Sequence, residues 1–168
     1  QGSINGDYLC YSVQPQEHDS DNLTLIENLQ SQFDTVESAR SFSYYEGIWI
    51  SPVNIQRRFN ANITAYEQFS DAAMLPPQVD SRLMSLFAGC WTAISFKYLT
   101  GGGIKGITFF ETAGERGIIQ GYLNSRWPDE FQTCKGMLFP VYFVLKYIAG
   151  NKNSGMTECT SSHPLKVD

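Results

Sequence analysis

Residues 106–117, GITFFETAGERG, decide the fold that we predict for this chain. Residues 107–110 are a short, apolar, β-rich run, which is typical of a buried strand. Glu111 follows the run directly and opens a polar turn bounded by glycines. The first side chain after a buried strand points into the mouth of a sheet or barrel, where α/β proteins bind ligands. Glu111 is therefore a candidate functional carboxylate; the structural alternative is that it pairs with Arg116 or caps the next turn.

The composition places the chain among globular proteins. Of its 168 residues, 42% are hydrophobic, 17% are charged and 14% are aromatic, which is enough for one domain with a hydrophobic core. The net charge of −5, without a basic block, argues against a nucleic-acid partner. No apolar stretch reaches the roughly 18 residues of a membrane span, so we expect no membrane insertion. Because no signal-peptide pattern is present either, we expect a cytoplasmic protein.

The order of predicted elements is strand, polar loop and helix, repeated three times. The predicted strands cover residues 7–13, 47–53 and 106–110, and the predicted helices cover 22–42, 78–99 and 138–149. Asp21 or Asn22 can cap the first helix, the glycines at 101–103 can stop the second, and Pro140 is tolerated in the first turn of the third. Each connection is long enough for a right-handed crossover, so the strands should be parallel. The predicted fold class is α/β, with three consecutive βα units.

Three parallel strands have two consequences. The loops that follow the strands gather at the carboxyl edge of the sheet, where a site would form. Three strands are too few for a closed barrel of eight strands and about 250 residues. We therefore expect residues 7–150 to be a piece of a larger barrel or a domain that completes itself by association. We expect residues 1–6 to be a tag remnant or disordered, and residues 151–168 to be a tail or linker.

The cysteines do not predict a metal site. No two of them have metal-ligand or C-x-x-C spacing. Cys10 and Cys90 lie in apolar contexts within predicted elements, so we expect both to be buried thiols. No phosphate-binding loop or nucleophilic-serine elbow is present. We expect neither a metal ion nor a cofactor.

Several short segments share the order and spacing of a known family. They are residues 51–53 with 58–60, 85–87, 108–112 with Gly114, Arg116 and Gly117, and 139–142 with 144–145. In these segments the chain resembles the C-terminal part of the TIM-barrel domain of the D-apionate lactonase family, a barrel similar to those of glycoside hydrolases. The resemblance implies the last three of eight strands and a hydrolase acting on a sugar lactone or glycoside. Two positions depart from the pattern, because Glu115 stands where an aromatic residue is expected and Phe143 where a histidine is expected.

Glu111 and His18 are the candidate catalytic residues. A strand-end carboxylate in a sugar-active barrel can act as nucleophile, as general acid or base, or as charge stabiliser. Lactone opening needs a base that activates water and donors that hold the developing oxyanion. A glycosidase instead needs a second carboxylate at a defined distance. His18 lies in the loop after the first strand and can serve as a base near neutral pH, although it can equally be a surface histidine.

The candidate binding residues lie in the same loops. They are Gln16, Asn54, Arg57, Arg58, Arg116 and Trp127. Arg57 and Arg58 can bind a carboxylate in bidentate fashion, as a sugar-acid product would require, or form ion pairs at the surface. Asn54 can hydrogen-bond sugar hydroxyls or cap a turn. Trp127 can stack on a sugar ring, whereas Trp91, on a predicted helix, is expected in the core.

Three functional alternatives remain open from the sequence. The chain can be part of a carbohydrate-processing hydrolase that is inactive by itself, a non-catalytic module that binds a sugar or sugar acid, or a self-associating α/β module. In the first case we expect Glu111, the loop with His18, and the arginine pair on one rim. In the third we expect a homodimer, formed through a barrel-interior face that is predicted to include Leu9, Tyr11, Trp49 or Ile50, and Phe109 or Phe110.

Overall fold

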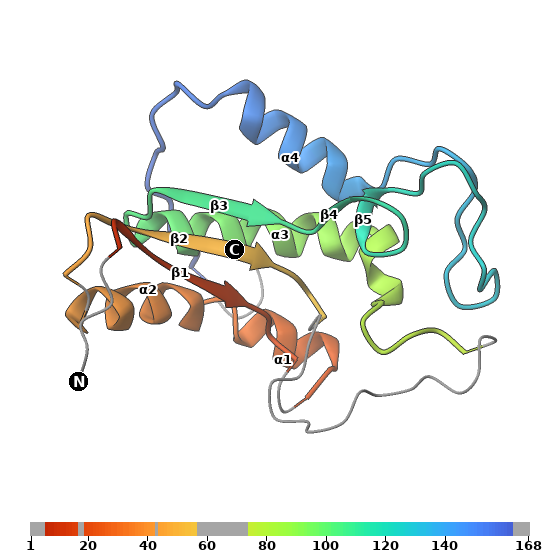
Figure 1. Ribbon diagram of the computed structural model, residues 1–168, viewed down its shortest axis with the longest axis horizontal. Helices are drawn as coiled ribbons and strands as arrows, with labels where there is room; N and C mark the ends of the chain where they lie inside the picture. Colours follow the sequence, from red (N-terminus) through yellow and green to blue (C-terminus); the bar gives the residue numbers. More distant parts are fainter. Residues whose placement is uncertain (1–5, 17–18, 43, 57–73, 163–168) are drawn as a thin grey trace.

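The three predicted strands form one parallel sheet. The computed structural model describes residues 6–16, 19–42, 44–56 and 74–162. Strands β1 (Tyr8–Val13), β2 (Gly47–Val53) and β3 (Gly106–Phe109) pair in the order β1-β2-β3, and both pairings are parallel (Figure 1). Within the described residues the sheet stays open, with β1 and β3 at its edges. The predicted α/β class and the partial barrel are confirmed.

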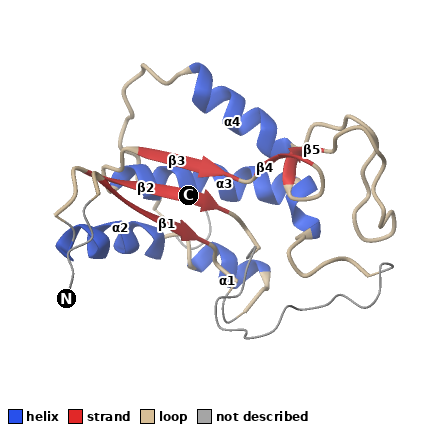
Figure 2. Ribbon diagram, viewed as in Figure 1, coloured by secondary structure: helices blue, strands red, loops and turns tan. Residues whose placement is uncertain are grey.

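Helices cover one face of this sheet. They are α1 (Asn22–Glu27), α2 (Ser31–Phe42), the short 3-10 helix η1 (Ser81–Met84), α3 (Leu86–Gly101) and α4 (Pro140–Gly150). Helix α2 contacts both β2 and α3, and α3 contacts α4. Figure 2 shows the strands in front of α3, with α2 below β1 and α4 above β3 in this view. The core lies between the strands and these helices, where Val36, Ile50, Trp91 and Leu99 are buried, so the expectation for Trp91 is confirmed.

Among the described residues, no helix or strand covers the other face of the sheet. Side chains alternate between the faces of a strand, and the residues facing the helices include Leu9, Tyr11, Ile50 and Phe109. The prediction that Leu9 and Tyr11 lie on the barrel-interior face is therefore wrong. For the two undecided pairs, Trp49 is exposed on the open face while Ile50 is buried, and both Phe109 and Phe110 pack against the core, so neither phenylalanine lies on the open face. We call Tyr8, Cys10, Trp49, Ser51 and Thr108 the open face.

The two predicted buried thiols are exposed. Cys10 lies on β1 with its side chain on the open face, and Cys90 lies on the solvent side of α3. In both cases the neighbouring residues in sequence are apolar, but the neighbours point toward the core and the cysteine does not.

Two predicted helices are each divided into two. In the first, Asp21 caps α1 by accepting hydrogen bonds from the backbone N–H groups of Leu23 and Thr24, as predicted. Turns interrupt the helix before α2, where the Ser31 hydroxyl donates to the carbonyl of Asn28. The second predicted helix, residues 78–99, is divided into η1, which Asp80 caps, and α3, which begins at Leu86. It ends at the predicted glycines, with Gly103 at φ +72°.

A second, small sheet follows β3. Strands β4 (Glu111–Ala113) and β5 (Gly117–Ile119) pair in parallel where a polar turn was predicted. The segment from there to α4 is irregular and is anchored by the buried rings of Phe131 and Phe139, whose centroids are 5.8 Å apart. None of the helices in the described ranges is long and apolar enough to cross a membrane.

Candidate functional site

The carboxyl ends of β2 and β3 place polar residues at one edge of the sheet. Asn54 follows β2, and its N–H donates to the Val13 carbonyl at the end of β1 (3.1 Å). Phe110 follows β3, and its N–H donates to the Val53 carbonyl (3.1 Å). Phe110 has φ +51°, in the left-handed region that is rare for a residue other than glycine. This turn of the backbone directs the chain away from the sheet, so that Glu111 begins β4.

Glu111 is held by the loop that follows it. Its Oε1 atom lies 3.2 Å from Nε of Arg116, and its backbone N–H donates to the Arg116 carbonyl (3.0 Å). The loop is tight, because a Cβ at position 117 would lie 2.6 Å from the backbone nitrogen of Ala113, which only glycine avoids. The pairing of Glu111 with Arg116, foreseen as the structural alternative, is therefore present. Both side chains remain partly exposed.

A cavity of about 250 Å³ lies beside this ion pair. We call it the rim cavity, and it is lined by Pro76, Gln78, Val79, Glu111, Ala113, Gly114, Glu115, Arg116 and Trp127. It brings together three of the predicted site residues, namely Glu111, Arg116 and Trp127. Ligand pockets for drug-sized molecules occupy about 300–1,000 Å³, so this volume suits a smaller molecule.

Trp127 contributes an unusual polar group to the lining. Its indole Nε1 is buried and has no hydrogen-bond partner in the described part of the chain. Buried N–H groups in proteins are nearly always paired, and an unpaired one calls for an explanation.

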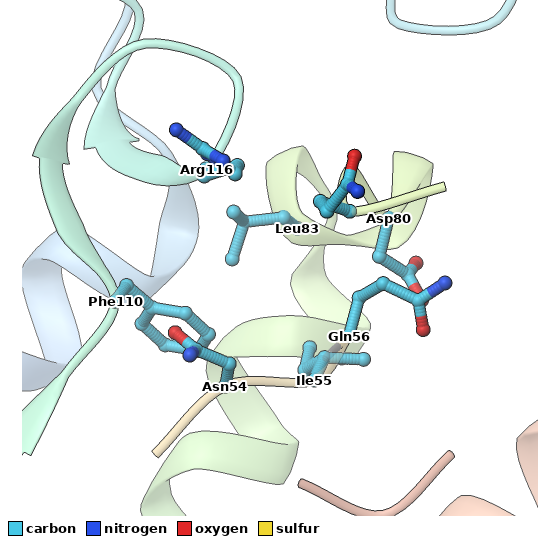
Figure 3. A pocket seen from close by; sticks show the side chains of 8 residues that line it. Asn54, Ile55, Gln56, Asp80, Leu83, Phe110 and Arg116 are labelled. Atoms are coloured by element: carbon cyan, nitrogen blue, oxygen red, sulfur yellow. The ribbon is translucent and has the colours of Figure 1, made fainter. Parts of the chain in front are cut away.

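A second pocket, of about 20 Å³, shares Gln78 and Arg116 with the lining of the rim cavity (Figure 3). Its lining is Asn54, Ile55, Gln56, Gln78, Asp80, Leu83, Phe110 and Arg116. Figure 3 shows Arg116 on the loop between β4 and β5, above Leu83 of η1. The pocket has room for about one water molecule, so it cannot hold a sugar. Asn54 lines this second pocket and is not part of the lining of the rim cavity.

Asp80 connects the loop after β1 to η1. Arg82 donates to both carboxylate oxygens of Asp80, from Nε to Oδ1 (2.9 Å) and from Nη2 to Oδ2 (2.7 Å). Gln16 donates from Nε2 to Asp80 Oδ2 (2.5 Å) and to the Ile55 carbonyl (3.0 Å). Burial alone would raise the pKa of Asp80, but the hydrogen bonds from Arg82 and Gln16 and the charge of Arg82 hold it below its usual value. The side-chain amide of Gln16 therefore holds the loop after β1 in place through these two hydrogen bonds.

A comparison with protein families identifies the kind of domain. The model of the D-apionate lactonase TIM barrel domain matches residues 4–153. The chain belongs to this family. No curated protein and no solved structure matches it. The rim cavity lies at the carboxyl edge of the parallel sheet. TIM-barrel enzymes carry their active sites at this end of the barrel.

Some predicted site residues cannot be placed relative to the rim cavity. His18, Arg57 and Arg58 lie outside the described residues. Four residues around the site were not predicted from the sequence: Gln78, Asp80, Arg82 and Glu115. Gln78, Asp80 and Arg82 were assigned to the regular helix at 78–99, and Glu115 was noted only as a departure from the family pattern. Within the described ranges, no three His, Cys, Asp or Glu side chains gather as metal ligands would.

Proposed function

We propose that the rim cavity is a sugar-lactone site and that the complete domain hydrolyses the lactone to its hydroxy acid. One observation carries this proposal. Glu111, Arg116 and Trp127 line a single cavity at the carboxyl edge of a parallel sheet, in a chain of the D-apionate lactonase barrel family. The set comprises a carboxylate, a guanidinium and an aromatic ring, which suit proton transfer, oxygen binding and stacking on a sugar ring.

The reaction assigns a role to each of these groups. A water oxygen attacks the carbonyl carbon of the lactone, and the Glu111 carboxylate accepts the proton that this water loses. Arg116, held against Glu111, and the Trp127 N–H supply donors for the oxyanion of the tetrahedral intermediate. The ring C–O bond then breaks, and the leaving oxygen takes the proton from Glu111. Lactone and water thus become the hydroxy acid.

The proposal includes inactivity of this chain alone. A barrel site draws its groups from several strands, and the described part of the chain has three in its main sheet. We expect the chain to bind a lactone without turning it over. His18, Arg57 and Arg58 remain candidates from the sequence for a second base and for binding of the acid product.

Two measurements test this proposal together. Isothermal titration with D-apionolactone should show saturable binding that Glu111→Ala weakens at least about tenfold, because both the carboxylate and the orientation of Arg116 are lost. Titration of released acid should show no turnover above the blank. Binding that is unaffected by Glu111→Ala would refute the site, and robust turnover of a lactone or an aryl glycoside would refute inactivity alone.

A second candidate function is self-association, which the open face favours. Parallel sheets are normally covered on both faces, yet Tyr8 and Trp49 are 50% and 40% exposed here. Their rings form an edge-to-face pair with centroids 6.5 Å apart. Light scattering at micromolar concentration should then report a dimer. A clean monomer of 18.9 kDa would refute this candidate and leave the lactone site untouched.

A further inference from the structure

Among the described residues that line the rim cavity, acidic side chains outnumber basic ones. Glu111 and Glu115 line it, and Arg116 is the one basic side chain among the described residues that do so. Arg116 is committed to Glu111 by the 3.2 Å ion pair. Glu115 is half-buried and has no hydrogen bond or ion pair within the described part of the chain. The lining that the structure describes therefore carries one uncompensated negative charge.

We propose that the rim cavity binds neutral sugar lactones in preference to the corresponding sugar acids, and that Glu115 is the residue that sets this preference. The inference rests on the proposed function and narrows its ligand class. A neutral lactone has no net charge and is not repelled by Glu115. A carboxylate of the same size is repelled by the negative charge of Glu115. The effect of one partly exposed charge is modest, and we expect it to weaken binding of the acid roughly three- to tenfold at low ionic strength.

This preference has a direct consequence for the reaction. Hydrolysis turns the neutral ligand into an anion inside the same cavity. The carboxylate that forms is repelled by Glu115, so the product leaves more easily than the substrate. A site that prefers neutral ligands to anions therefore reduces inhibition of the reaction by its acidic product.

The test compares one ligand pair in three proteins. The ligands are D-ribono-1,4-lactone and sodium D-ribonate, which differ in ring closure and charge. The proteins are the 168-residue chain, Glu115→Gln and Glu46→Gln. Glu46 lies before β2, at the opposite end of the sheet, so Glu46→Gln makes the same change in net charge away from the cavity. Affinities are measured by calorimetry at low and at physiological salt.

The expected result is specific to the acid. The unmodified chain binds the lactone more tightly than ribonate, and Glu115→Gln improves ribonate binding roughly three- to tenfold at low salt while lactone binding changes less than about twofold. Glu46→Gln behaves like the unmodified chain. If the lactone and ribonate bind with equal affinity and Glu115→Gln changes neither affinity, this inference is wrong while the proposed function stands. Tighter binding of ribonate also overturns it and favours the sequence-based prediction that Arg57 and Arg58 bind a carboxylate. If neither ligand binds, the proposed lactone site fails and this inference fails with it.

Discussion

Removing Arg82 should destabilise the protein strongly, because Arg82 neutralises a buried carboxylate. The Asp80 side chain is 7% exposed and Arg82 is 22% exposed. Arg82→Met removes both hydrogen bonds to Asp80 and those from Nη1 to the Ser20 carbonyl (2.7 Å) and Asn22 Oδ1 (2.9 Å). Breaking a buried ion pair costs about 3–5 kcal/mol, and the partial exposure of Arg82 favours the lower end, about 3 kcal/mol. For a domain of this size that corresponds to a fall in Tm of roughly 6–12 °C.

The pH dependence of the same variant checks the cause. Because the pKa of Asp80 is lowered in the folded protein, its contribution to stability is present above the unfolded carboxyl pKa of about 3.9 and is lost as the pH falls through the folded value. In Arg82→Met, the hydrogen bonds and the charge of Arg82 that favour the ionised Asp80 carboxylate are lost, so burial favours the protonated carboxyl. The difference in stability between the two proteins should therefore be largest near neutral pH and shrink toward acid pH.

Urea unfolding followed by tryptophan fluorescence measures both effects. Lys146→Met, at an exposed position of α4, is the control, because it removes a positive charge at the surface and should change stability by less than about 0.5 kcal/mol. A loss below about 1 kcal/mol in Arg82→Met, or a difference that is independent of pH, would show that this ion pair does not anchor η1.

Three further predictions follow from single positions. Gly117→Ala should cost about 1–3 kcal/mol and weaken lactone binding, because its Cβ would approach the Ala113 backbone to 2.6 Å; unchanged unfolding in urea would contradict this. Trp49→Ser should shift light scattering toward the monomer with little loss of stability, since Trp49 is 40% exposed; a dimer of unchanged strength would show that another surface mediates association. Cys10, Cys90, Cys134 and Cys159 should all react with a thiol reagent in the native protein, because all four are exposed; any thiol that reacts only after denaturation contradicts its placement.

Local signals in the sequence predicted most elements and part of the site. The strand ending before Glu111, the cap at Asp21 and the glycine stop after α3 each depend on neighbouring residues, and each is present. The face of β2 was not predictable, because Ile48, Trp49 and Ile50 are a continuous apolar run without alternation. The Gln16–Asp80 hydrogen bond joins residues 64 positions apart, which no local pattern reveals. The pairing of β4 with β5 depends on the close backbone approach at Gly117, which also has no local signature.

The most direct test of the account is a nitrogen–proton NMR titration of the three tryptophan indole groups with D-ribono-1,4-lactone. Trp127→Phe assigns the Trp127 signal, and Trp91 in the core and Trp49 on the open face serve as internal controls. If the lactone binds in the rim cavity, the Trp127 Nε1–H signal moves in a saturable manner as this unpaired donor meets a ligand oxygen, while the signals of Trp49 and Trp91 stay in place. A lactone that moves the Trp49 signal and leaves Trp127 unchanged would place the ligand on the open face and contradict the rim cavity as the site.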